Sequence, residues 1–187
     1  MPASDGLPEG AAAQLTVLED LHARLAAAGI DCWLRGGWAI DFLVGVVTRR
    51  HADIDVVVER AQRERLRALL AEAGYELGAE RDVQFDYRRD GVEISLVFIA
   101  RAVDGSVGVP GIPSWGWLPG ALDEPPRTLE GVTCRPLSLV QLADEKERYE
   151  RGAGRPLRPK DIESLDILHR LLARAPQSGE AQSGGAA

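Results

Sequence analysis

The fold of this chain is set by residues 33–58, which read WLRGGWAIDFLVGVVTRRHADIDVVV. A short apolar strand over residues 32–34 leads into the paired glycines Gly36 and Gly37, which tolerate backbone angles and close approaches that a side chain forbids. We expect a helix to begin at about Trp38, so that the free N–H groups and the positive end of its dipole attract an anion lying over the glycines. The stretch therefore predicts a phosphate cradle.

Two aspartates follow this cradle. Asp53 and Asp55 open a strand that continues through the β-branched run 56–58, which favours extended structure. Residues i and i+2 of a strand point to the same face about 6–7 Å apart at their α-carbons, so both carboxylates can lean toward one point. Proteins usually hold Mg²⁺ with one or two carboxylates plus phosphate oxygens of the substrate. The sequence thus predicts a magnesium site beside a polyphosphate.

The same stretch resembles the signature of the aminoglycoside and lincosamide nucleotidyltransferases, which belong to the polymerase-β-like nucleotidyltransferase superfamily. The resemblance rests on the run Gly36, Gly37, Trp38, Ala39, Ile40 and Asp41, followed by Gly45, Thr48, Arg49, His51, Asp53, Ile54 and Asp55. It implies an α+β nucleotidyltransferase fold, with a twisted mixed β-sheet flanked by helices and a small C-terminal helical part. It also implies Mg²⁺-dependent transfer of a nucleoside monophosphate, AMP from ATP, to a hydroxyl of a small antibiotic-like acceptor such as an aminoglycoside or lincosamide, with release of pyrophosphate.

A third carboxylate is expected from a hairpin. Residues 84–88 and 92–100 read as two strands joined around an Asp-Gly pair, which is a strong hairpin signal. The resembling enzymes carry an acidic residue on the second strand that completes the metal site or acts as a base, and Glu93 stands at that position. Glutamate replaces their usual aspartate here, and Ser95 stands where a histidine is often found. Asp53, Asp55 and Glu93 are therefore the expected catalytic residues and metal ligands.

Five residues are expected to bind the nucleotide: Gly36, Gly37, Arg49, His51 and Lys146. Arg49 and His51 closely precede the aspartates, where they either reach toward a triphosphate or brace the carboxylates. Lys146 falls on the otherwise apolar, inward face of a helix expected over residues 138–151. In the resembling enzymes a lysine on this helix contacts the phosphates of the nucleotide. The alternative is that Lys146 reaches solvent from the edge of the apolar stripe.

The rest of the chain divides into four parts. We expect a flexible tail over residues 1–10, the nucleotidyltransferase domain over 11–136, a helical subdomain over 137–174 and a disordered tail over 175–187. Apolar spacing predicts further helices over 11–28, 62–73 and 160–173, the last with Asp161 as its N-cap. The Gly- and Pro-rich segment 101–130 is too irregular for a regular element, and its residues Trp115 and Trp117 either form an acceptor-binding wall or fill the core.

Composition limits the possible partners. The chain has 187 residues and a net charge of −7, which argues against a broad nucleic-acid surface and suits a cationic acceptor. No apolar run approaches the ~20 residues that cross a bilayer, so we expect a cytoplasmic protein, monomeric or homodimeric.

Two rival functions stay open from the sequence. One is a minimal nucleotidyltransferase that modifies a protein or RNA, as in toxin–antitoxin pairs, and the other is a non-catalytic nucleotide-binding module.

Overall fold

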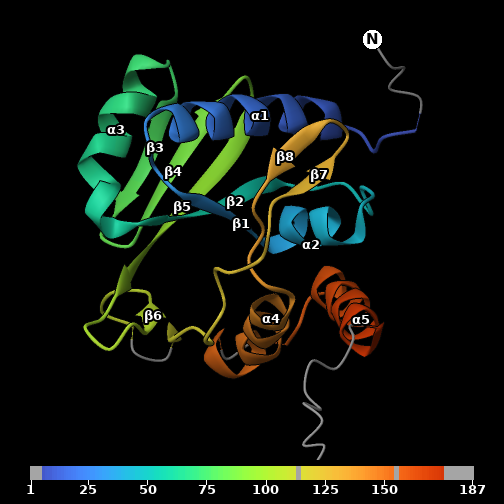
Figure 1. The fold of residues 1–187 in the computed structure, drawn as a ribbon. Helices are drawn as coiled ribbons and strands as arrows, with labels where there is room; N and C mark the ends of the chain where they lie inside the picture. The colour runs from blue at the N-terminus through green and yellow to red at the C-terminus, as the bar shows by residue number, and fades with distance from the viewer. Residues whose placement is uncertain (1–5, 113–114, 154–155, 175–187) are drawn as a thin grey trace, which may run out of the picture.

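A mixed β-sheet with helices on both sides forms the centre of the fold (Figure 1). The structure is a computed structural model that describes residues 6–112, 115–153 and 156–174. The predicted tail over 175–187 and residues 1–5 of the predicted N-terminal tail lie outside this range. In chain order the elements are α1 (Ala11–Ala27), β1 (Cys32–Arg35), α2 (Gly36–Val44), β2 (Asp53–Glu59), the 3₁₀ turn η1 (Arg60–Gln62), α3 (Arg63–Glu72), β3 (Glu76–Arg81), β4 (Gln84–Arg89), β5 (Val92–Arg101), β6 (Val107–Gly108), β7 (Arg127–Leu129), β8 (Val132–Cys134), α4 (Leu139–Ala153) and α5 (Pro159–Arg174).

The order of the sheet brings the two predicted acidic strands together. The strands lie in the order β1-β2-β5-β4-β3, and β6 pairs with β5. Strands β2 and β5 are parallel, whereas β1 with β2, β4 with β5 and β3 with β4 are antiparallel. The expected α+β class with a mixed sheet is confirmed. Because β2 and β5 run parallel and in register from Asp53 and Glu93, the predicted acidic residues start side by side at one end of the sheet.

The two faces of the sheet differ in chemistry. Val56 of β2 lines a small cavity together with Leu18 and Leu21 of α1. The face of β2 that carries Val56 therefore packs on α1. Side chains alternate along a strand, and Asp53 and Asp55 therefore project from the opposite face. Figure 1 shows α1 and α3 on one side of the sheet and α4 and α5 toward the other side. The acidic residues thus face the C-terminal helices.

The C-terminal helices complete the region around the glycine turn. Helices α4 and α5 pack against each other, and both contact α2. Their apolar positions agree with the predicted stripes, since Leu142 and Leu168 are buried. No described helix is long and apolar enough to cross a membrane.

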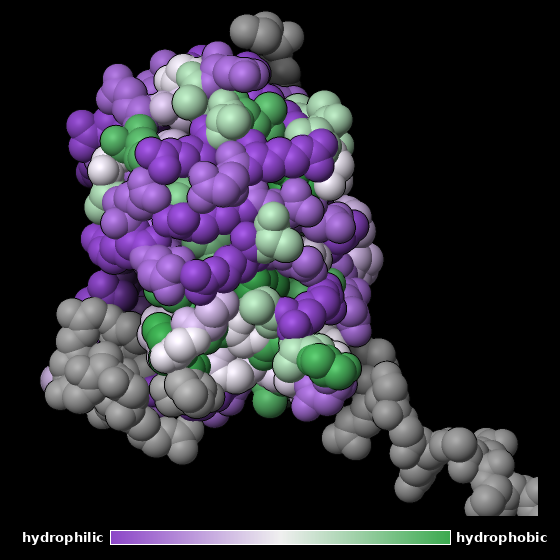
Figure 2. All heavy atoms as spheres, turned by 90° about the vertical axis from the view of Figure 1, so that its left-hand side faces the viewer, coloured by the Kyte–Doolittle hydropathy of each residue, from purple (hydrophilic) through white to green (hydrophobic). Residues whose placement is uncertain are grey.

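Helix α3, with its arginines, lies on the side of the molecule that faces the viewer in Figure 2. The upper part of that side is mainly hydrophilic.

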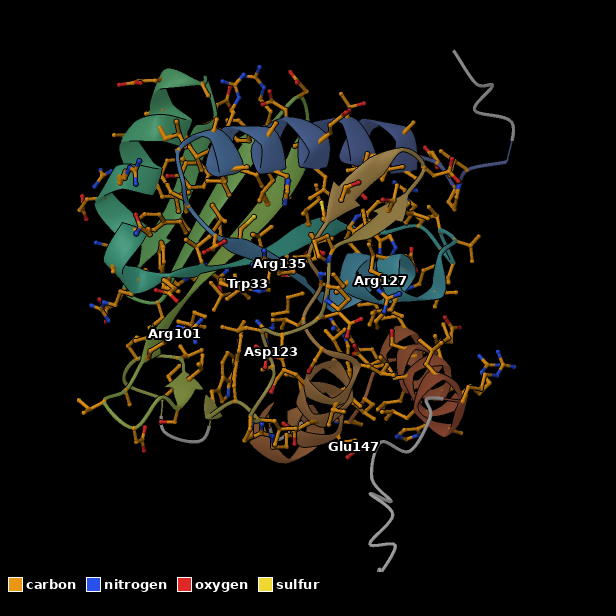
Figure 3. The ribbon with its side chains drawn as sticks, in the orientation of Figure 1. Trp33, Arg101, Asp123, Arg127, Arg135 and Glu147 are labelled. Atoms are coloured by element: carbon orange, nitrogen blue, oxygen red, sulfur yellow. The ribbon has the colours of Figure 1, made fainter. Side chains whose placement is uncertain are left out.

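Several element boundaries differ from the sequence-based expectations. Helix α2 begins at Gly36 instead of Trp38, so both glycines belong to its first turn. Strand β3 was not expected, because its residues alternate without strong apolar character. The segment 101–130 contains strands β6 and β7, and β7 forms a hairpin with β8. This segment is tied to the core, since Trp33 Nε1 donates to the Leu122 carbonyl over 3.0 Å. Arg135, directly after β8, contacts the same tryptophan, with its guanidinium carbon 5.7 Å from the ring centre (Figure 3).

Candidate active site

The glycine turn joins β1 directly to α2. Arg35 ends β1 in an extended conformation and contributes no side-chain cap to α2, so the N–H groups of the first helical turn are open to an anion. Gly36 has φ of +67°, and a Cβ built there would overlap the Asp55 carboxylate. Only glycine combines this backbone conformation with so close an approach. The predicted phosphate cradle therefore lies directly against Asp55, one of the three predicted metal ligands.

Asp53 and Asp55 lie on the same face of β2 but in different environments. Asp53 is exposed, whereas Asp55 is only partly accessible. Burial, followed by the negative charge of Asp53, raises the pKa of Asp55 above its ordinary value, and the nearby cations Arg35 and Lys146 oppose this rise. Adjacent carboxylates in a partly desolvated site repel one another, and a divalent cation relieves that repulsion. The donor chemistry of Asp53 and Asp55 therefore fits Mg²⁺.

Glu93 lies beside Asp53 but is already paired. The two residues are register partners on β2 and β5. The Glu93 carboxylate accepts a hydrogen bond from Arg88 Nε over 2.8 Å, and both side chains are about half exposed. Within residues 6–112, 115–153 and 156–174, no group of three or more His, Cys, Asp or Glu side chains lies close enough together to hold a metal ion. The described donors near the cradle are therefore a pair of aspartates, with Glu93 alongside.

A further carboxylate, Asp86, lies on the same face of the sheet and was missed by the sequence analysis. Ser95 is the register partner of both Asp55 on β2 and Asp86 on β4, so the three residues form a row across the sheet. Although burial opposes it, hydrogen bonds from Gln84 and Arg81 lower the pKa of Asp86. The turn at Asp90 and Gly91 fixes this register, and counting outward from that turn would have placed Asp86 opposite Ser95.

Lys146 points inward, as predicted, and has an anionic protein partner. Its Nζ donates to the Asp161 carboxylate over 2.6 Å, and Arg158 Nε donates to the same carboxylate over 2.7 Å. Asp161 is only 1% exposed, and despite this burial the two cations hold its pKa well below the usual range. Asp161 is not the N-cap that the sequence suggested, because α5 begins at Pro159 and places Asp161 inside the first turn. Lys146 also acts electrostatically on Asp55, so it belongs to the surroundings of the site.

His51 and Arg49 lie behind the glycine turn. His51 is buried, and its Nε2 lies 2.6 Å from the carboxylate of the fully buried Asp41. Asp41 also accepts a hydrogen bond from Thr48 Oγ1 over 2.6 Å. A Cβ on Gly37 would overlap the His51 ring and lie 2.7 Å from an Arg49 guanidinium nitrogen. These contacts place His51 and Arg49 against the glycine turn, whereas the sequence led us to expect that they reach toward a triphosphate or brace the carboxylates.

Arg35 is the second residue near the site that the sequence analysis missed. It is the antiparallel register partner of Asp55, and its Nε donates to Glu145 of α4 over 2.8 Å. Its guanidinium carbon lies 5.6 Å from the centre of the Trp115 ring. The two tryptophans of the 101–130 segment differ in exposure. Trp117 is buried, whereas Trp115 is 42% exposed. Arg35 thus connects the acidic pair to an exposed aromatic ring.

Comparison with known proteins identifies the family of this chain. The sequence model of the aminoglycoside-2''-adenylyltransferase family matches residues 17–168. The chain belongs to this family. The match covers all the elements that form the glycine turn, the acidic pair, Glu93 and Lys146, and it confirms the family resemblance predicted from the sequence.

Individual relatives of the family were also found. A 2''-aminoglycoside nucleotidyltransferase from Klebsiella pneumoniae is 35% identical over 72 residues, which make up 38% of this chain and 41% of that relative. The chain therefore matches less than half the length of this curated relative. A relative from Escherichia coli, also described as a 2''-aminoglycoside nucleotidyltransferase, has the same identity and coverage.

Two solved structures share the fold. ANT(2'')-Ia in complex with adenylyl-2''-tobramycin superposes with a TM-score of 0.72 at 23% identity, over 86% of this chain and 90% of that one. The lincosamide antibiotic adenylyltransferase LnuA, bound to lincomycin, gives a TM-score of 0.66 at 17% identity, over 85% and 96% of the two chains. At these identities the two structures establish the fold, and they confirm the predicted nucleotidyltransferase architecture.

Proposed function

We propose that this chain transfers AMP from ATP to a hydroxyl of a small antibiotic-like acceptor, an aminoglycoside or lincosamide, and releases pyrophosphate. One observation carries the proposal: Gly36, in the uncapped first turn of α2, lies directly against Asp55. A phosphate on the helix N-terminus would therefore lie beside the carboxylates that suit Mg²⁺. Membership of the aminoglycoside-2''-adenylyltransferase family supports the same reaction, which uses ATP supplied in the cytoplasm.

The residues around the glycine turn have separate roles in binding the metal and the nucleotide. Asp53 and Asp55 would hold Mg²⁺, which supplies charge neutralisation at the phosphates when bound. The N–H groups of the α2 first turn, beside Gly36 and Gly37, receive phosphate oxygens. Lys146 contributes positive charge from α4, held in place by Asp161. In this assignment Arg49 and His51 serve the nucleotide by fixing the glycine turn that binds it.

The chemical step is an in-line displacement. The acceptor hydroxyl oxygen forms a bond to the α-phosphorus while the bond from that phosphorus to the oxygen bridging the β-phosphate breaks, and pyrophosphate leaves. The hydroxyl proton passes to a carboxylate near the attacking oxygen. We assign this role to Glu93, which is the register partner of Asp53 and whose carboxylate is held by Arg88. Positioning and electrostatic stabilisation supply most of the catalysis in such transfers.

The acceptor class follows from the charge of this face. The negative charge of this face comes from Asp53 and Asp55, because Asp86 and Glu93 are paired with Arg81 and Arg88, and the whole chain has a net charge of −7. Such a surface attracts a polyamine-like acceptor and repels the phosphates of RNA. An aminoglycoside therefore suits the site better than a nucleic acid does.

The test is a product analysis. The purified chain is incubated with Mg²⁺, ATP and a panel of aminoglycosides and lincosamides, and the acceptors are examined by mass spectrometry for an added AMP, with Asp53→Asn as the control. The proposal predicts adenylylation of at least one acceptor by the wild type and none by the variant. Adenylylation of a protein or RNA in place of every small acceptor would contradict it.

A further inference from the structure

Trp115 is an exposed aromatic ring that the structure holds in a fixed place. Its backbone N–H donates to the Ile112 carbonyl over 2.9 Å. The next residues are anchored to α4, since Arg148 donates to the Gly116 carbonyl over 3.0 Å and the Leu118 N–H donates to Gln141 Oε1 over 2.9 Å. Of the four tryptophans, all of which the structure describes, Trp115 alone is exposed. An exposed ring with an anchored backbone offers a preformed surface for a ligand.

The ring lies on the same side of the sheet as the carboxylates. Arg35 and Asp55 are antiparallel register partners, so their side chains project from one face. The Arg35 guanidinium, fixed by Glu145, lies 5.6 Å from the Trp115 ring centre. A single arginine side chain therefore separates Trp115 from Asp55. This spacing places an aromatic surface within reach of the far end of a nucleotide whose phosphates lie at the glycine turn.

The charge of Arg35 decides what the ring can bind. Aromatic faces attract cations, but a guanidinium already occupies that interaction at Trp115. A second cation, such as the ammonium of an aminoglycoside, would have to compete with Arg35 for the ring. A neutral planar ring does not depend on that interaction and stacks well on tryptophan.

We infer that Trp115 is the stacking surface for the nucleobase of the nucleoside triphosphate, with Arg35 and Glu145 holding the orientation of the ring. This inference rests on the proposed function for the identity of the ligand. It assigns the base end of the nucleotide to the 101–130 segment and leaves the part of the acidic face around Glu93 and Asp86 to the acceptor.

The test separates the base from the phosphates. Dissociation constants for ATP and for inorganic tripolyphosphate, each with Mg²⁺, are measured by calorimetry for the wild type, Trp115→Ala and Trp115→Phe. Loss of one base–aromatic stack should weaken ATP on the order of tenfold in Trp115→Ala and change tripolyphosphate by less than about twofold, while Trp115→Phe keeps most of the ATP affinity. Val103→Ala, which truncates an exposed apolar side chain in the same segment, should change neither.

A second readout follows the ring itself. Because Trp115 is the exposed tryptophan, acrylamide should quench its fluorescence, and ATP but not tripolyphosphate should protect it. Three outcomes would overturn the inference: an unchanged ATP affinity in Trp115→Ala, an equal loss for both ligands, or a rise only in the KM of the acceptor. ATP binding through Trp115 without transfer to any acceptor would support the inference and reject the proposed function, whereas a wild type that does not bind ATP would reject both.

Discussion

Asp53 and Glu93 are register partners on the parallel strands β2 and β5, and the Glu93 carboxylate is held by Arg88 at 2.8 Å. A carboxylate in this position can take the proton of an acceptor hydroxyl that attacks beside Asp53. Removal of a general base typically lowers the rate by about 10²–10⁴-fold. Glu93→Gln should therefore lower kcat by at least about 100-fold, while the ATP dissociation constant changes by less than about threefold.

The matched control for Glu93 is Glu72→Gln, which removes an exposed carboxylate from α3, on the opposite side of the sheet (Figure 1). This variant should transfer at the wild-type rate. Near wild-type turnover in Glu93→Gln would show that the proton is taken elsewhere, with Asp86 the next carboxylate to test.

Position 36 requires glycine for two reasons, its positive φ angle and its close contact with Asp55. Ala at φ of +67° costs about 1–2 kcal/mol because of its Cβ, and that Cβ also displaces the Asp55 carboxylate. Gly36→Ala should lower the free energy of unfolding by about 1–2 kcal/mol and lower transfer by at least about 100-fold. Urea unfolding and the initial rate of transfer measure the two effects.

Gly45 provides the control for the backbone angle alone. It has φ of +85°, but nothing lies within 4 Å of a Cβ built there. Gly45→Ala should lose similar stability and keep its activity. Equal activities in the two alanine variants would mean that the contact between Gly36 and Asp55 has no part in the reaction.

The buried Asp161 should make the stability of the protein depend on pH. Its pKa is held below the ordinary value of 3.8 by Arg158 and Lys146, so its contribution is fully present above about pH 4 and is lost as the pH falls toward the lowered pKa. Asp161→Asn should cost about 2 kcal/mol of unfolding free energy at pH 7, and this difference should shrink below about pH 4. The exposed Asp166→Asn on the same helix is the control. A difference that grows on acidification would contradict the assignment.

The buried pair of His51 and Asp41 should behave as one unit. His51 Nε2 lies 2.6 Å from the fully buried Asp41, and removing one partner leaves the other polar group unsatisfied. His51→Ala and Asp41→Ala should each destabilise the protein, and a double-mutant cycle should give a coupling energy of about 1.5–3 kcal/mol. Urea unfolding of the four proteins measures it. A coupling energy near zero would mean that the contact does not brace the glycine turn.

Much of this architecture could be predicted from the sequence. The strand before Gly36, the acidic strand from Asp53 and the hairpin around Asp90 each carry strong local signals, and the structure has all three. Local signals also indicated that Lys146 points inward. The structure agrees because the apolar stripe of α4 packs against α2 and α5.

The contacts between distant segments could not be predicted in the same way. The partner of Lys146 is Asp161, fifteen positions away in a different helix, and the aromatic neighbour of Arg35 lies in a segment without a regular pattern. Such pairs depend on how α4, α5 and the 101–130 segment pack in space. Asp86 is the exception, since the two-residue turn at Asp90 and Gly91 fixes its register with Ser95.

The central claim is that the acidic pair at the glycine turn drives nucleotidyl transfer. The most direct measurement is pyrophosphate release from ATP by the wild type and by Asp55→Asn, with and without Mg²⁺, across a panel of aminoglycosides and lincosamides. We predict release that requires the metal and an acceptor and that falls by at least about 100-fold in Asp55→Asn. Full metal-dependent release by Asp55→Asn would contradict the account.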